Sequence, residues 1–256
     1  MKELSINQDA IKVKVEKQVK VRDILVDVPI KYQCSAAINA VFPISTKAAE
    51  AAIGSQKVRP LEILPGKSLL CITIFDFANT PVGPFTELTF SIAASYNPLF
   101  RVPLLSIPTS MLLRKFGFFV VSIAQSTDIA IEHGNLITGY PHYKKTIAVE
   151  LKKLNSSIHV IAQCDKQEIL QLYIEKPAKE KIKRESHMTY LIKDNRIFKI
   201  ELDVYGIIGK SKVYSLKLGE HELASYLKKF HISNRSIYTR FYRDTIKVVN
   251  SPKEAT

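Results

Sequence analysis

The stretch GYPHYKK, residues 139–145, places two adjacent lysines just after a Gly-aromatic-Pro turn. If a strand begins at Tyr143, alternation puts Lys145 on the same face as the apolar Ile147. Burial on that face disfavours an ammonium ion and lowers its pKa, and the neighbouring charge of Lys144 lowers it further. A lysine that is partly neutral near pH 7 can attack a carbonyl group and form a Schiff base.

The same spacing fits a second interpretation. At the start of a strand, Lys145 can extend its ammonium group into solvent while its methylene groups pack on apolar neighbours. Adjacent lysines are common on protein surfaces, because charged side chains are seldom fully buried. Alternation alone therefore leaves both a reactive amine and a solvated surface pair open.

Signatures of other chemistry are absent from the sequence. It contains no GxSxG, Walker A, GxGxxG or HExxH pattern, so the common hydrolase, nucleotide-binding and zinc-protease motifs are missing. The six histidines show no pairing at i+2 or i+4, and the three cysteines lie far apart. We therefore expect no metal and no cofactor.

Composition points to an ordinary globular chain. Of its 256 residues, 46% are apolar and 24% are charged, which suits one core rather than a disordered segment. Residues 1–24 are polar and Lys-rich, so we expect a basic N-terminal arm followed by a single domain over residues 25–256. The sparse, odd number of cysteines and the absence of an apolar leader predict a cytoplasmic protein.

The net charge of +13 suits a nucleic acid, an anionic membrane or small anionic substrates. The densest basic run, residues 176–185, contains two glutamates and no aromatic residue, which is typical of a solvated loop. The most apolar region, residues 97–124, is interrupted by charges and prolines before it reaches the length of a membrane span. We expect a small-molecule partner, with neither nucleic acid nor membrane.

Local signals predict many strands and few helices. Ser45 as a cap and Gly54 as a stop enclose a short Ala-rich helix, and a second helix is expected in EHELASYLKKF, residues 220–230. Strands are expected at residues 68–77, 87–96, 117–125, 145–154 and 158–176, with a hairpin turn at Asp194 and Asn195. The pattern predicts a β-rich α+β domain with an antiparallel sheet or barrel.

Three stretches resemble the acetoacetate decarboxylase-like proteins. They are STKAAEAAIGSQKVRPLEIL, LLCITIFDFANTPVGPFTELTFSI and AQSTDIAIEHGNLITGYPHYKK. Within them, GNLITGYP at residues 134–141 is similar to the family's run before its lysine pair, and GPFTE at residues 83–87 fits its glutamate element. The likeness extends from about Ser45 to Lys145, with one insertion at residues 97–115.

This resemblance implies a cone-like β-barrel with flanking helices, assembled as a homo-oligomer. It also implies a lyase that forms a Schiff base with a small keto acid. In that interpretation Lys144 is the amine and Lys145 its electrostatic neighbour, while Glu87 orients the substrate or handles protons. His142 could act as a general acid or base, because an unperturbed imidazole titrates close to neutrality.

The sequence departs from the family pattern at three positions. The family's reactive lysine directly follows the proline, where this chain has His142, and the lysine pair comes two residues later. An insertion of two residues preserves strand parity, so Lys144 would face where His142 does. The family's acidic residue falls on Ile72, and its arginine falls near Ser35.

Two alternatives to the keto-acid lyase follow from these departures. One is a catalytically degenerate barrel that binds a small ligand without turning it over. The other is an enzyme on the same scaffold that forms no imine and uses His142 as its acid or base. Fold alone does not choose among the three.

Overall fold

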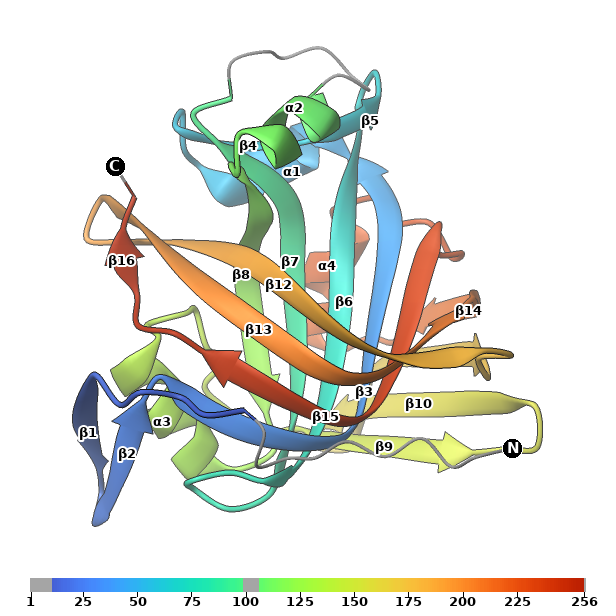
Figure 1. Ribbon diagram of the computed structural model, residues 1–256. Helices are drawn as coiled ribbons and strands as arrows, with labels where there is room; N and C mark the ends of the chain where they lie inside the picture. The colour runs from blue at the N-terminus through green and yellow to red at the C-terminus, as the bar shows by residue number, and fades with distance from the viewer. Residues whose placement is uncertain (1–10, 99–105, 256) are drawn as a thin grey trace.

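Seven long strands close into a ring in the computed structural model, which describes residues 11–98 and 106–255 (Figure 1). In order around the ring they are β7 (Phe85–Tyr96), β8 (Phe116–Gln125), β12 (Glu180–Lys193), β13 (Arg196–Ser211), β15 (Tyr238–Val249), β3 (Ile30–Ser45) and β6 (Lys67–Asn79). Pairing of β6 with β7 closes the barrel. Neighbours are antiparallel except β8 and β12, which run parallel. The predicted β-rich, mainly antiparallel barrel is confirmed.

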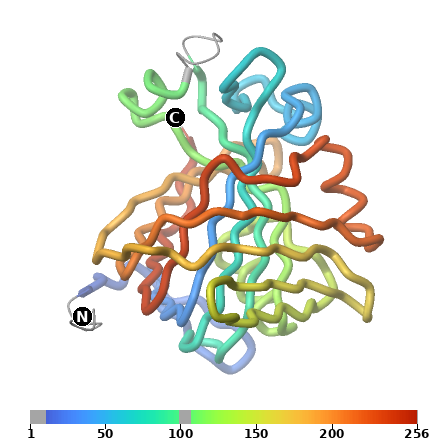
Figure 2. Tube along the Cα trace, turned by 90° about the vertical axis from the view of Figure 1, so that its right-hand side faces the viewer, coloured from blue at the N-terminus to red at the C-terminus, as the bar shows by residue number. Residues whose placement is uncertain are grey.

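The remaining elements cover the barrel (Figures 1 and 2). A second sheet contains β14 (Val213–Leu218), β11 (Gln167–Glu175), β10 (Ser157–Cys164) and β9 (Ala148–Lys153). Short strands extend the edges: β1 (Lys17–Val21), β2 (Ile24–Val28), β4 (Val58–Pro60), β5 (Glu62–Leu64) and β16 (Lys253–Glu254). The helices are α1 (Thr46–Ile53), α2 (Ser106–Leu112), α3 (Asp128–Ile137) and α4 (Glu222–Lys228). In Figure 1, α3 and the β1–β2 hairpin lie at one end of the barrel, and α1 and α2 lie at the other.

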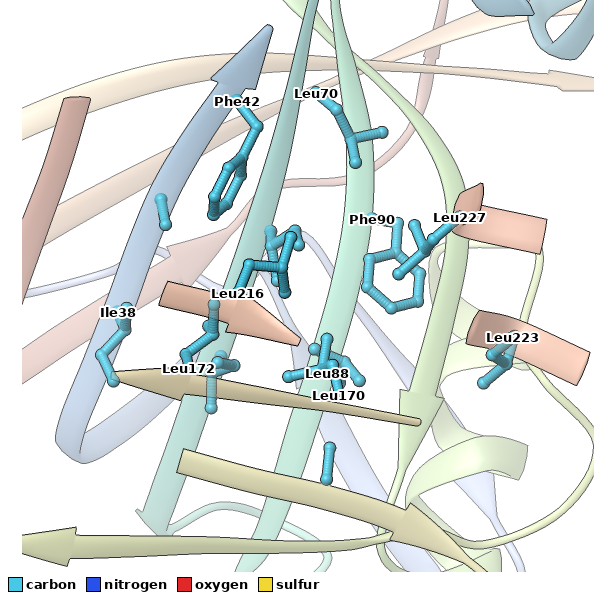
Figure 3. Close-up of a cluster of buried hydrophobic side chains, with 14 of the residues drawn as sticks. Ile38, Phe42, Leu70, Leu88, Phe90, Leu170, Leu172, Leu216, Leu223 and Leu227 are labelled. Atoms are coloured by element: carbon cyan, nitrogen blue, oxygen red, sulfur yellow. The ribbon is translucent and has the colours of Figure 1, made fainter. Parts of the chain in front are cut away.

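Strands β3, β6 and β7 are buried on both faces. Their outward residues, such as Ile38, Leu70 and Leu88, pack against Leu172 of the second sheet and Leu227 of α4 (Figure 3). Alternation turns the intervening residues of the same strands toward the barrel interior. The outer rows thus form the main apolar core, and the inner rows are left to line a cavity.

A coupled irregularity in β15 and β3 decides which residues face that interior. In β15 the side chains that line the cavity are those of Tyr242 and then of Thr245 and Lys247, so the inward-facing positions change from even to odd numbers. The change occurs around Asp244, whose φ is +47°. The ladder with β13 shifts register at the same place. There Gly206 makes room, because a Cβ would lie 2.1 Å from Thr245 Cγ2. A β-bulge of this kind rotates the following side chains to the opposite face, and here it turns Lys247 inward.

Several local expectations are confirmed. Helix α1 begins after Ser45, whose hydroxyl accepts a hydrogen bond from the Ala48 amide, and ends at Gly54 with φ +62°. Helix α4 lies within the expected segment, and Asp194 and Asn195 form the turn between β12 and β13. The alternating runs at residues 68–77, 87–96 and 117–125 fall within β6, β7 and β8.

Other expectations differ from the structure. The strand expected from Lys145 begins only at Ala148, because residues 144–145 form a bend that alternation cannot describe. Helix α3 was not expected, although Thr127 caps it. Part of the expected basic arm lies at residues 1–10, outside the described residues. The part at Lys17–Val21 forms β1, where Val21 is fully buried, so this segment does bury an apolar face.

None of the helices in the described ranges is long and apolar enough to cross a membrane.

The bulge yields a prediction about stability. Asp244→Val should lower the free energy of unfolding by about 1–2 kcal/mol, because a β-branched residue is strained at positive φ. Asp244→Asn and Asp244→Gly should change it by less than about 0.5 kcal/mol, since both residues tolerate this backbone conformation. Urea denaturation of the three variants measures the difference. Equal losses in all three would show that the backbone at residue 244 does not matter.

Candidate functional site

The barrel encloses a cavity of about 110 Å³, which has room for a small organic molecule. Its lining comes from the inner faces of the ring strands and from the turn that follows α3. The surface that faces the cavity is mainly apolar, although many of the lining residues also carry a polar side-chain group, such as the hydroxyls of Ser91 and Thr245. An apolar cavity with a few convergent polar groups is the usual form of a small-molecule site.

A buried ion pair crosses this cavity. Lys247 Nζ on β15 lies 3.5 Å from Glu87 Oε1 on β7, and each residue is only 7% exposed. Gln125 Nε2 donates to Glu87 Oε2 at 2.8 Å, and the Thr89 hydroxyl donates to Glu87 Oε1 at 3.1 Å. Both carboxylate oxygens therefore have partners, which a buried charge requires.

Aromatic rings surround the amine of Lys247. Its Nζ lies 3.8 Å from the centroid of the Phe75 ring, 5.2 Å from that of Phe77 and 6.0 Å from that of Tyr32. A cation over aromatic faces is attracted to their π electrons, and these contacts also exclude water. The amine thus lies in a largely apolar environment with one carboxylate beside it.

His142 lines the cavity from the turn after α3. Its segment runs beside β8, where the Tyr143 amide donates to the Ile123 carbonyl at 2.7 Å. Its Nδ1 donates to the Tyr140 carbonyl at 2.8 Å. Its Nε2 lies against Gly134, where a Cβ would come within 2.2 Å. The helix can therefore carry only glycine at this position without displacing the imidazole.

Burial favours the uncharged form of the histidines and thiols near the amine. Burial lowers the pKa of His142, although the negative charge of Glu87 acts in the opposite direction. Burial also lowers the pKa of His133 to about 4. It also raises the pKa of the Cys34 thiol to about 12 and that of the Cys71 thiol to about 11. With its Nδ1 proton on the Tyr140 carbonyl, neutral His142 keeps a lone pair on Nε2 and can accept a proton.

The expected site residues separate into two groups. Glu87 and His142 line the cavity. Lys144 and Lys145 are exposed, and Lys145 Nζ pairs with Asp165 at 2.9 Å, with side chains 63% and 69% exposed. The hydrogen bond that Lys145 donates to the Asp165 carboxylate raises the pKa of Lys145, opposite to the expected lowering. The lysine pair precedes the first residue of β9, so strand alternation does not turn it inward.

The two family positions without their expected side chains also face away from the cavity. Ile72 is fully buried in the core between the barrel and the second sheet, while its neighbours Cys71 and Thr73 line the cavity. Ser35 is exposed and donates to the Asp76 carboxylate. Neither Ile72 nor Ser35 therefore contributes a side chain to the cavity lining.

Sequence reasoning missed Lys247 and Gln125. Lys247 stands in the apolar run TIKVV, and a lysine inside such a run was a usable signal. Its direction was hidden, since the parity change at Asp244 cannot be read from hydrophobic alternation. Gln125 ends a predicted strand, but nothing in the sequence marks it as the partner of Glu87.

No group of three or more His, Cys, Asp or Glu side chains that could hold a metal ion occurs among residues 11–98 and 106–255.

A comparison with protein-family models finds no match, and a comparison with curated proteins finds none either. Solved structures do match. The chain is similar to an acetoacetate decarboxylase at 14% identity, with 89% of each chain covered and a TM-score of 0.61. It is similar to acetoacetate decarboxylase from Legionella pneumophila subsp. pneumophila str. Philadelphia 1 at 14% identity, with 99% of this chain and 98% of that chain covered and a TM-score of 0.61.

A third solved structure extends the likeness to another enzyme. It is the enduracididine biosynthesis enzyme MppR complexed with pyruvate, at 8% identity, with 89% of this chain and 90% of that chain covered and a TM-score of 0.57. At these identities the likeness establishes the fold. The chain has the acetoacetate decarboxylase-like fold, a scaffold that it shares with several enzymes.

The ion pair predicts a coupled effect on stability. Glu87→Gln should lower the free energy of unfolding by about 3 kcal/mol, because it leaves the Lys247 ammonium buried without its counter-charge. Glu87→Gln combined with Lys247→Met should recover most of that loss, since no unpaired charge then remains. Urea denaturation of the single and double variants measures the coupling. Asp165→Asn, which breaks an exposed pair, is the control and should have little effect. Additive losses at Glu87 and Lys247 would argue against the pair.

His133 predicts a pH dependence of stability. Its side chain is 1% exposed and neither ring nitrogen has a partner, and its pKa is lowered to about 4 in the folded chain. In the unfolded chain this histidine has its ordinary pKa of about 6.5. Between pH values of about 4 and 6.5 the unfolded chain therefore binds more protons than the folded chain. Stability should therefore fall by about 3 kcal/mol as the pH decreases from about 6.5 to 4.

His133→Phe should remove that contribution and flatten the acid side of the profile, as measured by urea denaturation at several pH values. His231→Asn, at an exposed position with positive φ, is the matched control and should leave the profile unchanged. An unchanged acid loss in His133→Phe would show that other groups cause it.

Proposed function

We propose that this protein is a lyase-type enzyme that forms a Schiff base with a small carbonyl compound inside the barrel, with Lys247 as the amine. The observation that carries the proposal is the position of Lys247 Nζ, buried in the cavity and 3.5 Å from the Glu87 carboxylate. Amines held in apolar pockets are the usual Schiff-base nucleophiles. Lys247 takes the part that the resemblance assigned to Lys144.

The chemistry begins with a proton transfer. Glu87 accepts a proton from the Lys247 ammonium, and the neutral amine adds to the carbonyl carbon to give a carbinolamine. The protonated Glu87 returns the proton as the hydroxyl group leaves as water, which forms the iminium ion. The iminium then accepts the electron pair of a bond on the adjacent carbon, so that the bond between this carbon and its leaving group can break and an enamine forms. The net change is one ammonium and one carbonyl converted into one iminium and one water.

The neighbouring residues have distinct parts in this proposal. Gln125 and Thr89 donate to the two oxygens of Glu87 and hold its carboxylate toward the amine. His142, neutral and half-buried, accepts or returns a proton at the substrate through Nε2. Lys145 has no part, since it is bound to Asp165 in solvent.

A keto acid is the substrate class that the resemblance implies. The similar enzyme MppR was solved in complex with pyruvate, which is a keto acid. Both facts support a substrate with a ketone group, which is the group that the amine attacks. The cleaved bond and the rest of the substrate depend on the other groups in the cavity.

The contact between Lys247 and Glu87 also supports a second candidate. If the pair stays ionic, the amine is not free to attack, and the barrel binds a small ligand without an imine. His142 could then act as the acid or base of another reaction. The two candidates differ in one measurable property, a covalent bond at Lys247.

Reductive trapping tests the proposal. Incubation of the full chain with small ketones and sodium cyanoborohydride should give a secondary amine, which peptide mass spectrometry should locate on Lys247. Lys247→Met should abolish the adduct. Lys144→Met and Lys145→Met are matched controls that should retain it within about twofold. An adduct on Lys144 or Lys145, or none at all, would reject Lys247 as the amine.

The homo-oligomer and the cytoplasmic location expected from the sequence stay predictions. Helix α2 carries the exposed side chains Met111 and Leu112, which are apolar surface that a second copy could cover. Light scattering of the purified chain measures the oligomeric state.

A further inference from the structure

The positive and negative charges of the described cavity lining balance. Among the described residues that line it, Lys247 is the one lysine or arginine and Glu87 is the one aspartate or glutamate. Their separation of 3.5 Å makes each the counter-ion of the other. The cavity therefore contains one positive and one negative charge, and they are already paired.

The other titratable groups of the lining do not add a cation. Burial lowers the pKa of both His142 and His187, which favours the uncharged imidazole. His187 faces the cavity from β12, with Glu185 on the same strand 3.8 Å away, and has an edge contact with the Phe118 ring. Once the amine has become an iminium ion beside Glu87, the described lining therefore offers no second cation that could pair with a carboxylate of the substrate.

A free carboxylate on the substrate would bring an extra negative charge into this environment. Removing a carboxylate from water costs several kcal/mol unless a cation or several donors compensate it. Phe75, Val120 and Leu202 offer neither. The lining hydroxyl groups of Thr89, Thr189 and Tyr242 already donate within the protein, to Glu87, the Ile200 carbonyl and Glu185. Glu87 would also repel the second carboxylate. An uncharged substituent carries no such cost and gains from contact with the apolar wall.

Two acceptors in the lining point to a donor on the ligand. Gln125 donates its Nε2 to Glu87, which fixes the amide orientation and leaves its Oε1 buried without a partner. His142 donates its Nδ1 to the Tyr140 carbonyl, which leaves the lone pair of Nε2 free. A buried acceptor without a hydrogen bond costs free energy. The hydroxyl group of a ligand would remove this cost by donating to one of the two acceptors.

We infer that the substrate of this site is an uncharged hydroxy ketone or hydroxy aldehyde with no free carboxylate, in contrast to the keto acid that the fold suggests. The inference rests on the proposed Schiff base at Lys247 and specifies the compound that forms it. The hydroxyl group donates to Gln125 Oε1 or His142 Nε2, and the apolar body contacts the wall of the barrel.

Three four-carbon ketones test this inference by trapping with sodium cyanoborohydride on the full chain. Acetoacetate carries the carboxylate, 4-hydroxy-2-butanone replaces it with a CH₂OH group, and 2-butanone has neither. At equal concentrations and pH 7, 4-hydroxy-2-butanone should give at least tenfold more adduct on Lys247 than acetoacetate. It should also exceed 2-butanone, because only the hydroxyl group satisfies the free acceptor.

The outcomes separate this inference from the proposed function. If acetoacetate gives as much adduct on Lys247 as 4-hydroxy-2-butanone, the Schiff base holds and the uncharged substrate class is wrong. If 2-butanone equals 4-hydroxy-2-butanone, the hydroxyl requirement is wrong. If no ketone gives an adduct on Lys247, the proposed function fails, and the inference fails with it.

A charge variant provides a second, non-covalent measurement. Glu87→Gln removes the negative charge and leaves the Lys247 ammonium unpaired, so its cavity should prefer the anion. Calorimetric titration should show acetoacetate binding to Glu87→Gln more tightly than to the unmodified chain by at least tenfold, with little change for 2-butanone. Unchanged acetoacetate binding would overturn the view that charge balance excludes carboxylates.

Discussion

Two opposite charges are held inside the barrel although each loses its hydration there, and the inner surface is arranged around them. Glu87 has a donor for each of its carboxylate oxygens, and the Lys247 ammonium lies over three aromatic rings. Because a buried charge without partners costs several kcal/mol, these neighbours are conditions for the pair to exist. The polar inner row of β7 meets this need, while its outer row, with Leu88 and Phe90, contributes to the core.

Hydrophobic alternation and capping signals account for much of the fold. Ser45 and Gly54 determine α1 locally, and β6, β7 and β8 have the β-branched and aromatic character of strands. Closure of the ring is different, since it depends on pairings between distant segments such as β3 with β15. It was predicted from the resemblance to a family, which implied a barrel, and the solved structures with the same fold agree.

The site was less predictable than the fold, for reasons that lie in particular residues. Alternation was extended to Lys145, three residues before β9 begins, and so placed this side chain on the apolar face, whereas it is exposed. At Asp244 a positive φ and a shift in register reverse which side chains of β15 face the interior, and no hydrophobic pattern marks this change. The inward direction of Lys247 was therefore missed. Glu87 and His142 were named as candidates because a turn and a proline mark their positions in the sequence. Both residues line the cavity, and their roles stay predictions. A shared fold therefore does not determine which side chains line the cavity.

The position of β15 in the sequence affects how the barrel closes during synthesis. Of the seven strands in the ring, β15 comes last in the sequence, and it fills the gap between β13 and β3. It also supplies Lys247, so closure of the barrel and arrival of the amine are one event. During synthesis the earlier strands emerge first and can pair, but the edges of β3 and β13 stay open until β15 joins them. A nascent chain therefore exposes two unpaired strand edges and lacks the Lys247–Glu87 ion pair until β15 docks.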